Sequence, residues 1–256
     1  MGSARPPQAA AAPTADRATD CSGGWSRLER SRLERNRERR ASGVVSGIES
    51  VRRKWGGERL TSESQTDLQT EAYGPEGDSS KHRSMADLNA DLAALPPAPR
   101  DRGSLILIVR RLPDGQRETP KTTRLTQEEG IPGDGWSRRP PRDPGAQLTV
   151  MRMDIAQIMA GGQPLTHFGD NLFVDLDLSA QSLPPGSQVR VGQALVEVTP
   201  LPHDGCRKFK GRFGQEALVF VAAPATRPEN RRGIHWKVIE PGEAEIGSII
   251  EVVSRP

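Results

Sequence analysis

The sequence predicts a mainly β domain, a barrel or a sandwich, that follows an N-terminal extension without a hydrophobic core. Only 34% of the residues are hydrophobic and 4% are aromatic, with 26 glycines and 22 prolines, which is too little apolar material for one globule of 256 residues. The C-terminal part instead shows many short apolar runs separated by Gly and Pro turns. Its roughly 150 residues are enough for a core of their own.

Residues 1–84 are interpreted as a disordered, low-complexity extension. A segment rich in Ala, Pro, Ser and Gly is followed by a tandem Ser-Arg-Leu-Glu-Arg repeat at 26–30 and 31–35. The alternating charges of the repeat favour a solvated helix, with a basic arm that contacts phosphates as the alternative. The change of character at Met85 suggests that translation begins there, in which case residues 1–84 would have no function.

Charge is unevenly distributed along the chain. Residues 1–84 hold 15 Lys and Arg against 12 Asp and Glu, whereas the remainder holds 21 of each. The expected domain is therefore neutral, so the sequence pI near 9.1 does not predict nucleic-acid binding by it. The apolar runs are too short to cross a membrane, no signal peptide is recognisable, and Cys21 and Cys206 predict no disulfide framework. We expect a cytoplasmic protein.

Short elements follow one another from residue 85 onward. A helix at 85–95 with a linker to 102 is expected to precede a domain over 103–254. In that domain, strands are expected at 104–110, 119–125, 169–178, 188–198 (a hairpin with Gly192 at its tip), 234–239 and 248–253, a helix at 148–161, and a helix end or strand at 217–222.

Residues 198–214 carry the strongest chemical signal. Pro200, Pro202 and Gly205 interrupt the strand pattern just before Cys206, which predicts a loop. The residues around the thiol in sequence are His203, Arg207, Lys208, Lys210 and Arg212. Cations lower the pKa of a thiol, and the thiolate is both the nucleophile and the metal ligand. A buried structural cysteine is the simpler alternative, although such a residue more often lies within the apolar strand pattern.

Other chemical motifs are absent from the sequence. It contains no phosphate-binding glycine loop and no nucleophile elbow. A structural zinc site is not expected, because His203 and Cys206 have only His167 and His235 as the nearest further ligands.

Residues from about 103 to 253 resemble the MOSC domain, named for the C-terminal domain of molybdenum-cofactor sulfurase. The matching pieces, in the order of the family, are Leu125–Asp134, Gln147–Met151, Phe168–Leu172, Pro185-Gly186 with Val191-Gly192, His203–Cys206 and Arg232-Gly233. Each piece is weak alone, but six in order are specific. The chain departs from the family at Gly247-Ser248, where Gly-Asp is usual, and residues 1–84 have no counterpart.

The resemblance implies a MOSC-type β-barrel with a pocket at the Cys206 loop and a bound molybdenum cofactor with Cys206 as metal ligand. His203 would donate a proton or cap the loop, and Asn171 would fix the loop backbone or contact the ligand. The cations expected to hold an anionic cofactor are Arg207, Lys208, Arg231 and Arg232. Each of them taken alone is better explained as a surface charge.

Three functions remain open. The first, which we favour because the domain is not fused to a desulfurase, is a molybdenum-dependent oxidoreductase. It would reduce small N-hydroxylated molecules with electrons from a separate reductase. The second is a sulfur carrier that receives a Cys206 persulfide from a cysteine desulfurase. The third is a non-catalytic binding module. Pyridoxal phosphate is linked to the family only through sulfurase relatives, and no lysine here is clearly placed for a Schiff base.

Overall fold

The computed structural model describes residues 76–256, so the Ser-Arg-Leu-Glu-Arg repeat and most of the expected extension lie outside the described residues. The α-helices of this part are α3 (Met85–Ala94), α4 (Met153–Ala160) and α5 (Arg207–Ala222). The strands are β1 (Arg102–Ile108), β2 (Arg110–Arg111), β3 (Arg117–Glu118), β4 (Thr122–Leu125), β5 (Leu148–Arg152), β6 (Leu172–Asp175), β7 (Gln188–Val191), β8 (Ala194–Val198), β9 (Ile234–Glu240), β10 (Gly242–Glu245) and β11 (Ile249–Ser254). Across residues 76–256, no helix combines the length and apolar character needed to cross a membrane.

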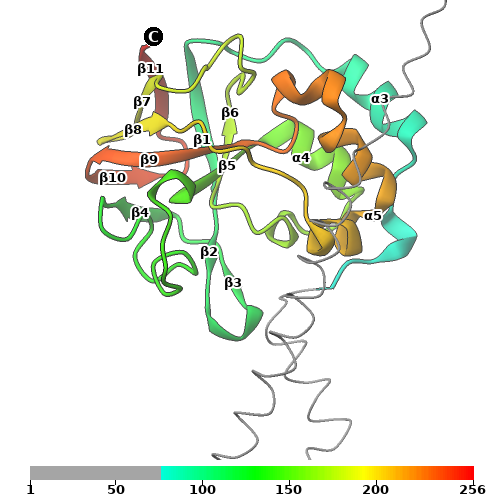
Figure 1. Cartoon of the computed structure of the whole chain (residues 1–256), viewed down its shortest axis with the longest axis horizontal. Coiled ribbons are helices and arrows are strands. Elements are labelled where there is room, and N and C mark those ends of the chain that lie inside the picture. Colours follow the sequence, from blue (N-terminus) through cyan, green and yellow to red (C-terminus); the bar gives the residue numbers. More distant parts are fainter. Residues whose placement is uncertain (1–75) are drawn as a thin grey trace, which may run out of the picture. The chain divides into compact units, whose positions relative to one another are not determined.

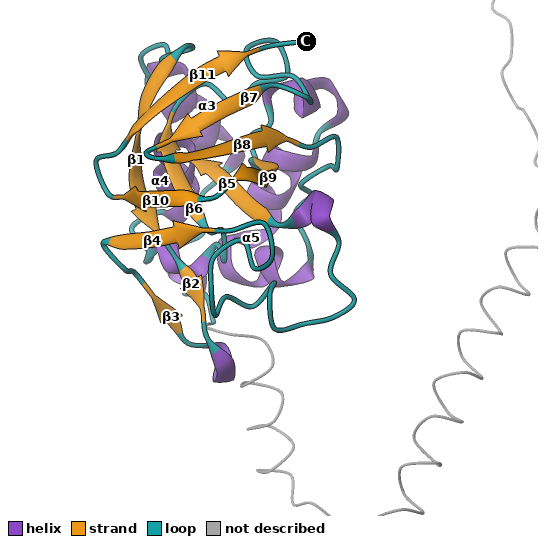
Figure 2. Cartoon of the chain, turned by 90° about the vertical axis from the view of Figure 1, so that its left-hand side faces the viewer, coloured by secondary structure: helices purple, strands orange, loops and turns teal. Residues whose placement is uncertain are grey.

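The strands form a closed barrel with the order β1-β11-β7-β8-β9-β5-β6. β1 closes the barrel by pairing with β6, and every pairing is antiparallel except that of β5 with β6. The three helices gather on one side of this barrel (Figures 1 and 2). The predicted mainly β class, with a barrel and few helices, is confirmed. Closure leaves no free edge among the seven barrel strands.

Two cores follow from this arrangement. The first fills the barrel with residues such as Leu105, Val196 and Trp236, all fully buried. The second lies between the barrel and the helices and includes Phe173 and Phe213. The aromatic rings of this second core hold α5 on the barrel, and the rings of Phe168 and Phe213 stack with their centroids 4.1 Å apart. Because Cys206 directly precedes α5, this packing also positions the thiol.

The prediction of a helix at 148–161 is wrong over its first third. Leu148–Arg152 is strand β5, and helix α4 begins only at Met153. The reason is burial on both faces, since four consecutive residues, 148–151, are buried between the barrel interior and the helical layer. Such a continuous apolar run does not show the alternation of a half-exposed strand, so the pattern alone does not separate it from a helix.

The loop expected through residue 214 ends earlier. α5 begins at Arg207, and a left-handed backbone conformation at Gly214 (φ 93°) kinks it. The expected hairpin at 188–198 is present, and Gly192 at its tip has φ 58°. The expected return strand at 119–125 forms only over β4, which pairs with β10, and the strand that pairs with β2 is the shorter β3 just before it.

Residues 76–84, which the sequence analysis placed in the extension, contact the rest of the described chain. The backbone N–H of Asp78 donates to Gln163 Oε1 over 2.8 Å. Ser84 caps α3 by accepting a hydrogen bond from the N–H of Asp87. A Cβ atom added at Gly214 would lie 2.9 Å from Cγ of His82, which shows how closely this segment passes the kink in α5.

Candidate functional site

Cys206 is exposed and unpaired, at the position immediately before the first turn of α5. Its carbonyl accepts a hydrogen bond from the N–H of Lys210 over 3.0 Å, which starts the helix. The side chain makes no capping hydrogen bond. The thiol is therefore available to a ligand or a reagent, unlike the buried structural cysteine that was the simpler alternative.

The segment that leads to Cys206 is fixed at several points. Thr199 Oγ1 donates to the carbonyl of Gly145 over 2.6 Å, and a ring nitrogen of His235 lies 3.1 Å from the carbonyl of Leu201. Gly205 packs against α5 so closely that an added Cβ would lie 2.5 Å from Leu218 Cδ1. A larger residue at this position would have to displace the end of the Leu218 side chain, so glycine suits the packing of the residue before Cys206.

A buried polar network lies beneath this segment. Asp170 is fully buried and accepts a hydrogen bond from Arg232 Nη1 over 2.7 Å. His203 Nε2 lies 3.4 Å from the second carboxylate oxygen of Asp170, and the rings of His203 and His235 are 4.5 Å apart. Arg232 also lies over the ring of Phe209 at 5.1 Å. The network ties the Cys206 loop to the barrel.

Burial is the largest cause of the pKa shifts of Asp170 and His203 in this network. It raises the pKa of Asp170, and the charge and hydrogen bond of Arg232 oppose that effect. It lowers the pKa of His203 well below the ordinary value, and repulsion from Arg232 and His235 acts in the same direction. His203 is therefore neutral at neutral pH. A buried neutral imidazole beside Asp170 is suited to holding the loop, which is one of the two roles expected for this residue.

Five cations interact electrostatically with one another and are here called the basic cluster: Arg111, Arg117, Arg139, Lys208 and Arg212. Burial lowers the pKa of Arg117 to about 10, with repulsion from Arg212 and Arg111 adding to the effect. Burial also lowers the pKa of Lys208, followed by repulsion from Arg139 and Arg212. A thiolate at Cys206 would act in the opposite direction and raise the pKa of both Lys208 and Arg212. The thiol thus lies at the edge of the cluster.

Arg111 is the most firmly held member of the basic cluster. Its Nε donates to Asp134 Oδ1 over 3.0 Å, and its two Nη atoms donate to the carbonyl of Gly169 over 3.3 Å and to Asn171 Oδ1 over 3.2 Å. Burial acts to raise the pKa of Asp134, but the hydrogen bond and charge of Arg111 outweigh it and the pKa is lowered. The carboxylate of Asp134 is thus already engaged.

A cavity of about 370 Å³, here called the basic pocket, borders the cluster. It is lined by Arg111, Trp136, Arg139, Arg142, Thr149 and His235, among others. Arg111 and Arg139 belong to both the cluster and the pocket wall. An anionic ligand in this pocket would meet several arginines at once, which is the arrangement that recognises phosphate and carboxylate groups.

The structure places the four cations that the sequence analysis expected at the site in different environments. Lys208 joins the basic cluster and Arg207 is exposed in the same helical turn. Arg232 is committed to Asp170 inside the protein. Arg231 donates to Glu229 over 2.8 Å and lies over the ring of Phe220 at 4.4 Å, so these contacts place it at the end of α5 rather than in the cluster.

Asn171 is fully buried and positions other groups. Its Oδ1 accepts from the N–H of Thr149 over 3.1 Å and from Arg111, and its Nδ2 donates to the carbonyl of Val109 over 3.3 Å. These contacts favour the first of its two expected roles, fixing the backbone. They also make it a support for Arg111.

Sequence reasoning did not single out Arg111, Arg117 or Arg139, and it named Arg212 only as one of the cations near Cys206 in the sequence. A signal existed for Arg111, because its partner Asp134 ends the motif at 125–134 that resembles a family turn. Arg117 and Arg139 gave no such signal, since they lie in separate segments and meet the other cations only in the folded chain.

Comparison with known proteins shows which family part of the chain resembles. Residues 146–251 match the family model described as the MOSC domain. Residues 146–251, less than half of the chain, are therefore similar to a MOSC domain. MOSC domains are associated with the molybdenum cofactor, and the matched residues include Cys206 and the buried network around Asp170. No curated protein matches the chain.

Solved structures show more distant similarity to this chain. YiiM from Escherichia coli is 23% identical, with a TM-score of 0.41 over 60% of this chain and 71% of the other. The YUAD protein from Bacillus subtilis is 19% identical, with a TM-score of 0.45 over 62% of this chain and all of the other. YiiM from Geobacillus stearothermophilus is 15% identical, with a TM-score of 0.37 over 62% of this chain and 76% of the other.

Proposed function

We propose that this protein binds the molybdenum cofactor with Cys206 as a ligand of the metal, and that it acts in the reduction of small N-hydroxylated molecules. One observation carries the proposal: an exposed thiol lies at the edge of a basic cluster in which the carboxylate of Asp134 is already engaged by Arg111. A thiol and an excess of positive charge are the two features that an anionic, sulfur-bound metal cofactor requires from a protein.

The donor set fits this cofactor. Thiolates select soft metals, and one thiolate suffices where a cofactor brings further sulfur ligands of its own. Guanidinium groups bind the phosphate end of such a cofactor in a bidentate manner. When bound, the cofactor would supply a redox centre that accepts and donates electrons.

The basic cluster is prepared for an anion. Arg111 is oriented in advance by Asp134 and Asn171, so little side-chain entropy is lost when it binds. The lowered pKa of Arg117 reflects burial and like-charge repulsion within the protein. A bound anion would relieve that repulsion, and part of the binding free energy comes from this relief.

The proposed reaction requires a partner that supplies electrons. Conversion of an N–OH group to N–H consumes two electrons and two protons and releases one water. The proposal therefore includes an electron-donating reductase as a separate protein, and the described residues of this chain serve to hold and orient the cofactor.

A sulfur carrier is the second candidate, and the exposure of Cys206 favours it. A thiolate that reagents can reach can accept sulfur from the persulfide of a cysteine desulfurase and pass it to an acceptor. This function needs no metal, so bound metal separates the two candidates.

To test this proposal, the full chain is expressed as wild type and as Cys206→Ala in cells that make the molybdenum cofactor. Molybdenum is measured by elemental analysis, and the pterin is measured by fluorescence after oxidation. The proposal predicts near-stoichiometric molybdenum in wild type and little or none in the variant. Absence of molybdenum in both, with a persulfide at Cys206, would support the carrier. Equal molybdenum in both would show that Cys206 is not the ligand.

A further inference from the structure

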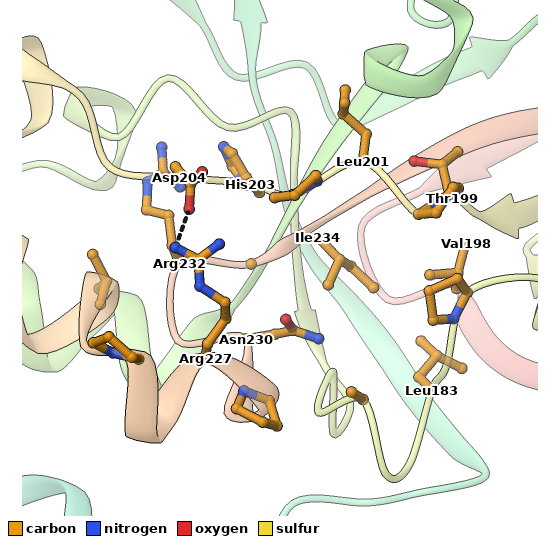
Figure 3. A pocket seen from close by; sticks show the side chains of 18 residues that line it. Leu183, Val198, Thr199, Leu201, His203, Asp204, Arg227, Asn230, Arg232 and Ile234 are labelled. Atoms are coloured by element: carbon orange, nitrogen blue, oxygen red, sulfur yellow. Dashed lines mark ion pairs between the residues drawn. The ribbon is translucent and has the colours of Figure 1, made fainter. Parts of the chain in front are cut away.

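A second cavity, here called the apolar pocket, borders the segment that leads to Cys206 and has a volume of about 380 Å³ (Figure 3). It is distinct from the basic pocket. His203 lines the apolar pocket and His235 lines the basic pocket, and their rings contact each other at 4.5 Å between centroids. This histidine pair therefore forms part of the partition between the two cavities.

The wall of the apolar pocket is mainly hydrophobic and stiff. Its aliphatic members include Leu183, Val198, Leu201, Val221 and Ile234, and its prolines are Pro185, Pro200, Pro202, Pro224 and Pro228. Proline fixes its own φ angle and offers no N–H donor. A wall built this way keeps its shape and favours apolar contact, which is the usual character of a preformed small-molecule site.

The charges around the apolar pocket compensate one another. Asp204 and Arg227 form an ion pair of 3.4 Å among the lining residues, with both side chains more than half exposed (Figure 3). The charge of Arg232 is balanced by Asp170 at 2.7 Å. His203 is neutral, because burial lowers its pKa well below the ordinary value. The pocket therefore has no excess charge to attract an ion, in contrast to the basic pocket.

Two lining residues carry buried polar atoms without a hydrogen-bond partner among the described residues. These atoms are His203 Nδ1 and Arg232 Nε. Buried polar atoms are normally hydrogen-bonded, and an unpaired one lowers stability. A ligand or water that brings a hydrogen-bonding group to this end of the pocket would supply the missing partner.

We infer that the apolar pocket binds a small, uncharged organic molecule, mainly apolar and carrying one hydrogen-bonding group. The volume sets the size, since a cavity of roughly 150 Å³ holds benzene and sites above roughly 300 Å³ hold larger ligands. A two-ring aromatic compound fits this range. The inference does not depend on the proposed function, because neither Cys206 nor the basic cluster lines this pocket.

Indole is a suitable probe, since it has two rings, no charge and one N–H donor. Indole is titrated into the full chain and followed by calorimetry and by NMR shifts. Ala180→Phe adds a ring at an exposed lining position, and Leu201→Glu adds a charge at another. Val219→Glu is the matched control, because Val219 is an exposed apolar residue of α5 outside the wall.

We expect saturable binding of one indole, weakened at least tenfold in each lining variant and unchanged in Val219→Glu and in Cys206→Ala. Indole-3-carboxylate should bind at least tenfold more weakly than indole, because its charge has no partner in the pocket. Thermal unfolding of each variant checks that it is folded. No saturable binding to the wild type, equal affinity in the folded lining variants, or tighter binding of the carboxylate would overturn the inference. Failure of molybdenum binding leaves these results unaffected, so the two proposals are tested separately.

Discussion

Arg232 Nη1 donates a hydrogen bond of 2.7 Å to Asp170 Oδ2, and both side chains are buried. Asp170 lies just before β6 and Arg232 just before β9, and His203 of the Cys206 loop approaches the other carboxylate oxygen. Three segments that are distant in sequence therefore meet at one buried carboxylate. This contact sets where the loop before Cys206 can lie.

Removing the charge of Asp170 should destabilise the protein strongly. In Asp170→Asn the guanidinium of Arg232 stays buried without a counter-charge, which costs about 3–5 kcal/mol of the free energy of unfolding. Glu229→Gln is the control, because it breaks the partly exposed pair with Arg231 and should cost less than about 1 kcal/mol. Urea denaturation measures both. Equal losses in the two variants would contradict the structural role given to Asp170.

The kink in α5 predicts opposite effects for two glycines of one helix. Gly214 has φ 93° and passes close to His82, so Gly214→Ala should destabilise the protein by about 1–3 kcal/mol. A Cβ at Gly211 meets nothing within 4 Å, so Gly211→Ala should stabilise the helix by about 0.5–1 kcal/mol. Thermal unfolding should give shifts of opposite sign. A loss of stability in Gly211→Ala as large as in Gly214→Ala would contradict the kinked helix.

Stability should fall as the pH is lowered toward 5. Burial lowers the pKa of His203 well below 6.5, so the unfolded chain binds a proton near that pH that the folded protein does not. The free energy of unfolding then decreases from about pH 7 to about pH 5. Asp170 acts in the opposite direction, since burial raises its pKa, and so the comparison with a variant is decisive.

The variant for this comparison is His203→Gln, which has no titrating ring. Its free energy of unfolding should fall less steeply over the same pH range than that of the wild type, whatever its absolute stability. His235 and His167, whose pKa values burial also lowers, account for the slope that remains. Denaturant titrations at several pH values measure the slopes. Parallel profiles for the two proteins would exclude a neutral buried His203.

Binding of an anionic cofactor should depend on the cations that the structure brings together. Arg139→Gln removes a cation that belongs to both the basic cluster and the basic pocket. One charge-assisted hydrogen bond is worth about 1.5–3 kcal/mol, so the affinity for the cofactor should fall about ten- to hundredfold. Arg124→Gln, which removes an exposed arginine paired with Glu243, should change it little. Molybdenum retained after dialysis measures the effect, and equal retention in both variants would contradict the role of the cluster.

The parts of the fold that the sequence predicted are those with local signals. The hairpin around Gly192 has alternating apolar residues on both sides of a turn, and its register follows from that pattern. β5 had no such signal, because Leu148–Met151 are buried on both faces. The pairing of β4 with β10 joins residues more than 100 positions apart, and no local pattern encodes it.

The candidate site was also predictable only where a residue carries a local signal in the sequence. Cys206 stood out through its own chemistry and the prolines and glycine before it, and the structure leaves it exposed. Arg231 and Arg232 are adjacent in sequence, yet one contacts Glu229 at the end of α5 and the other is buried on Asp170. Arg117 and Arg139 come close to Lys208 only through the fold, so no spacing in the sequence marks them.

X-ray absorption at the molybdenum edge tests the central claim most directly. Cys206→Ser is compared with wild type after both have been loaded with the molybdenum cofactor, which the basic cluster should retain in part in the variant. If Cys206 ligates the metal, the wild-type spectrum should require one more sulfur neighbour than the variant spectrum. An identical number of sulfur neighbours in the two spectra would contradict the assignment of Cys206 as the metal ligand.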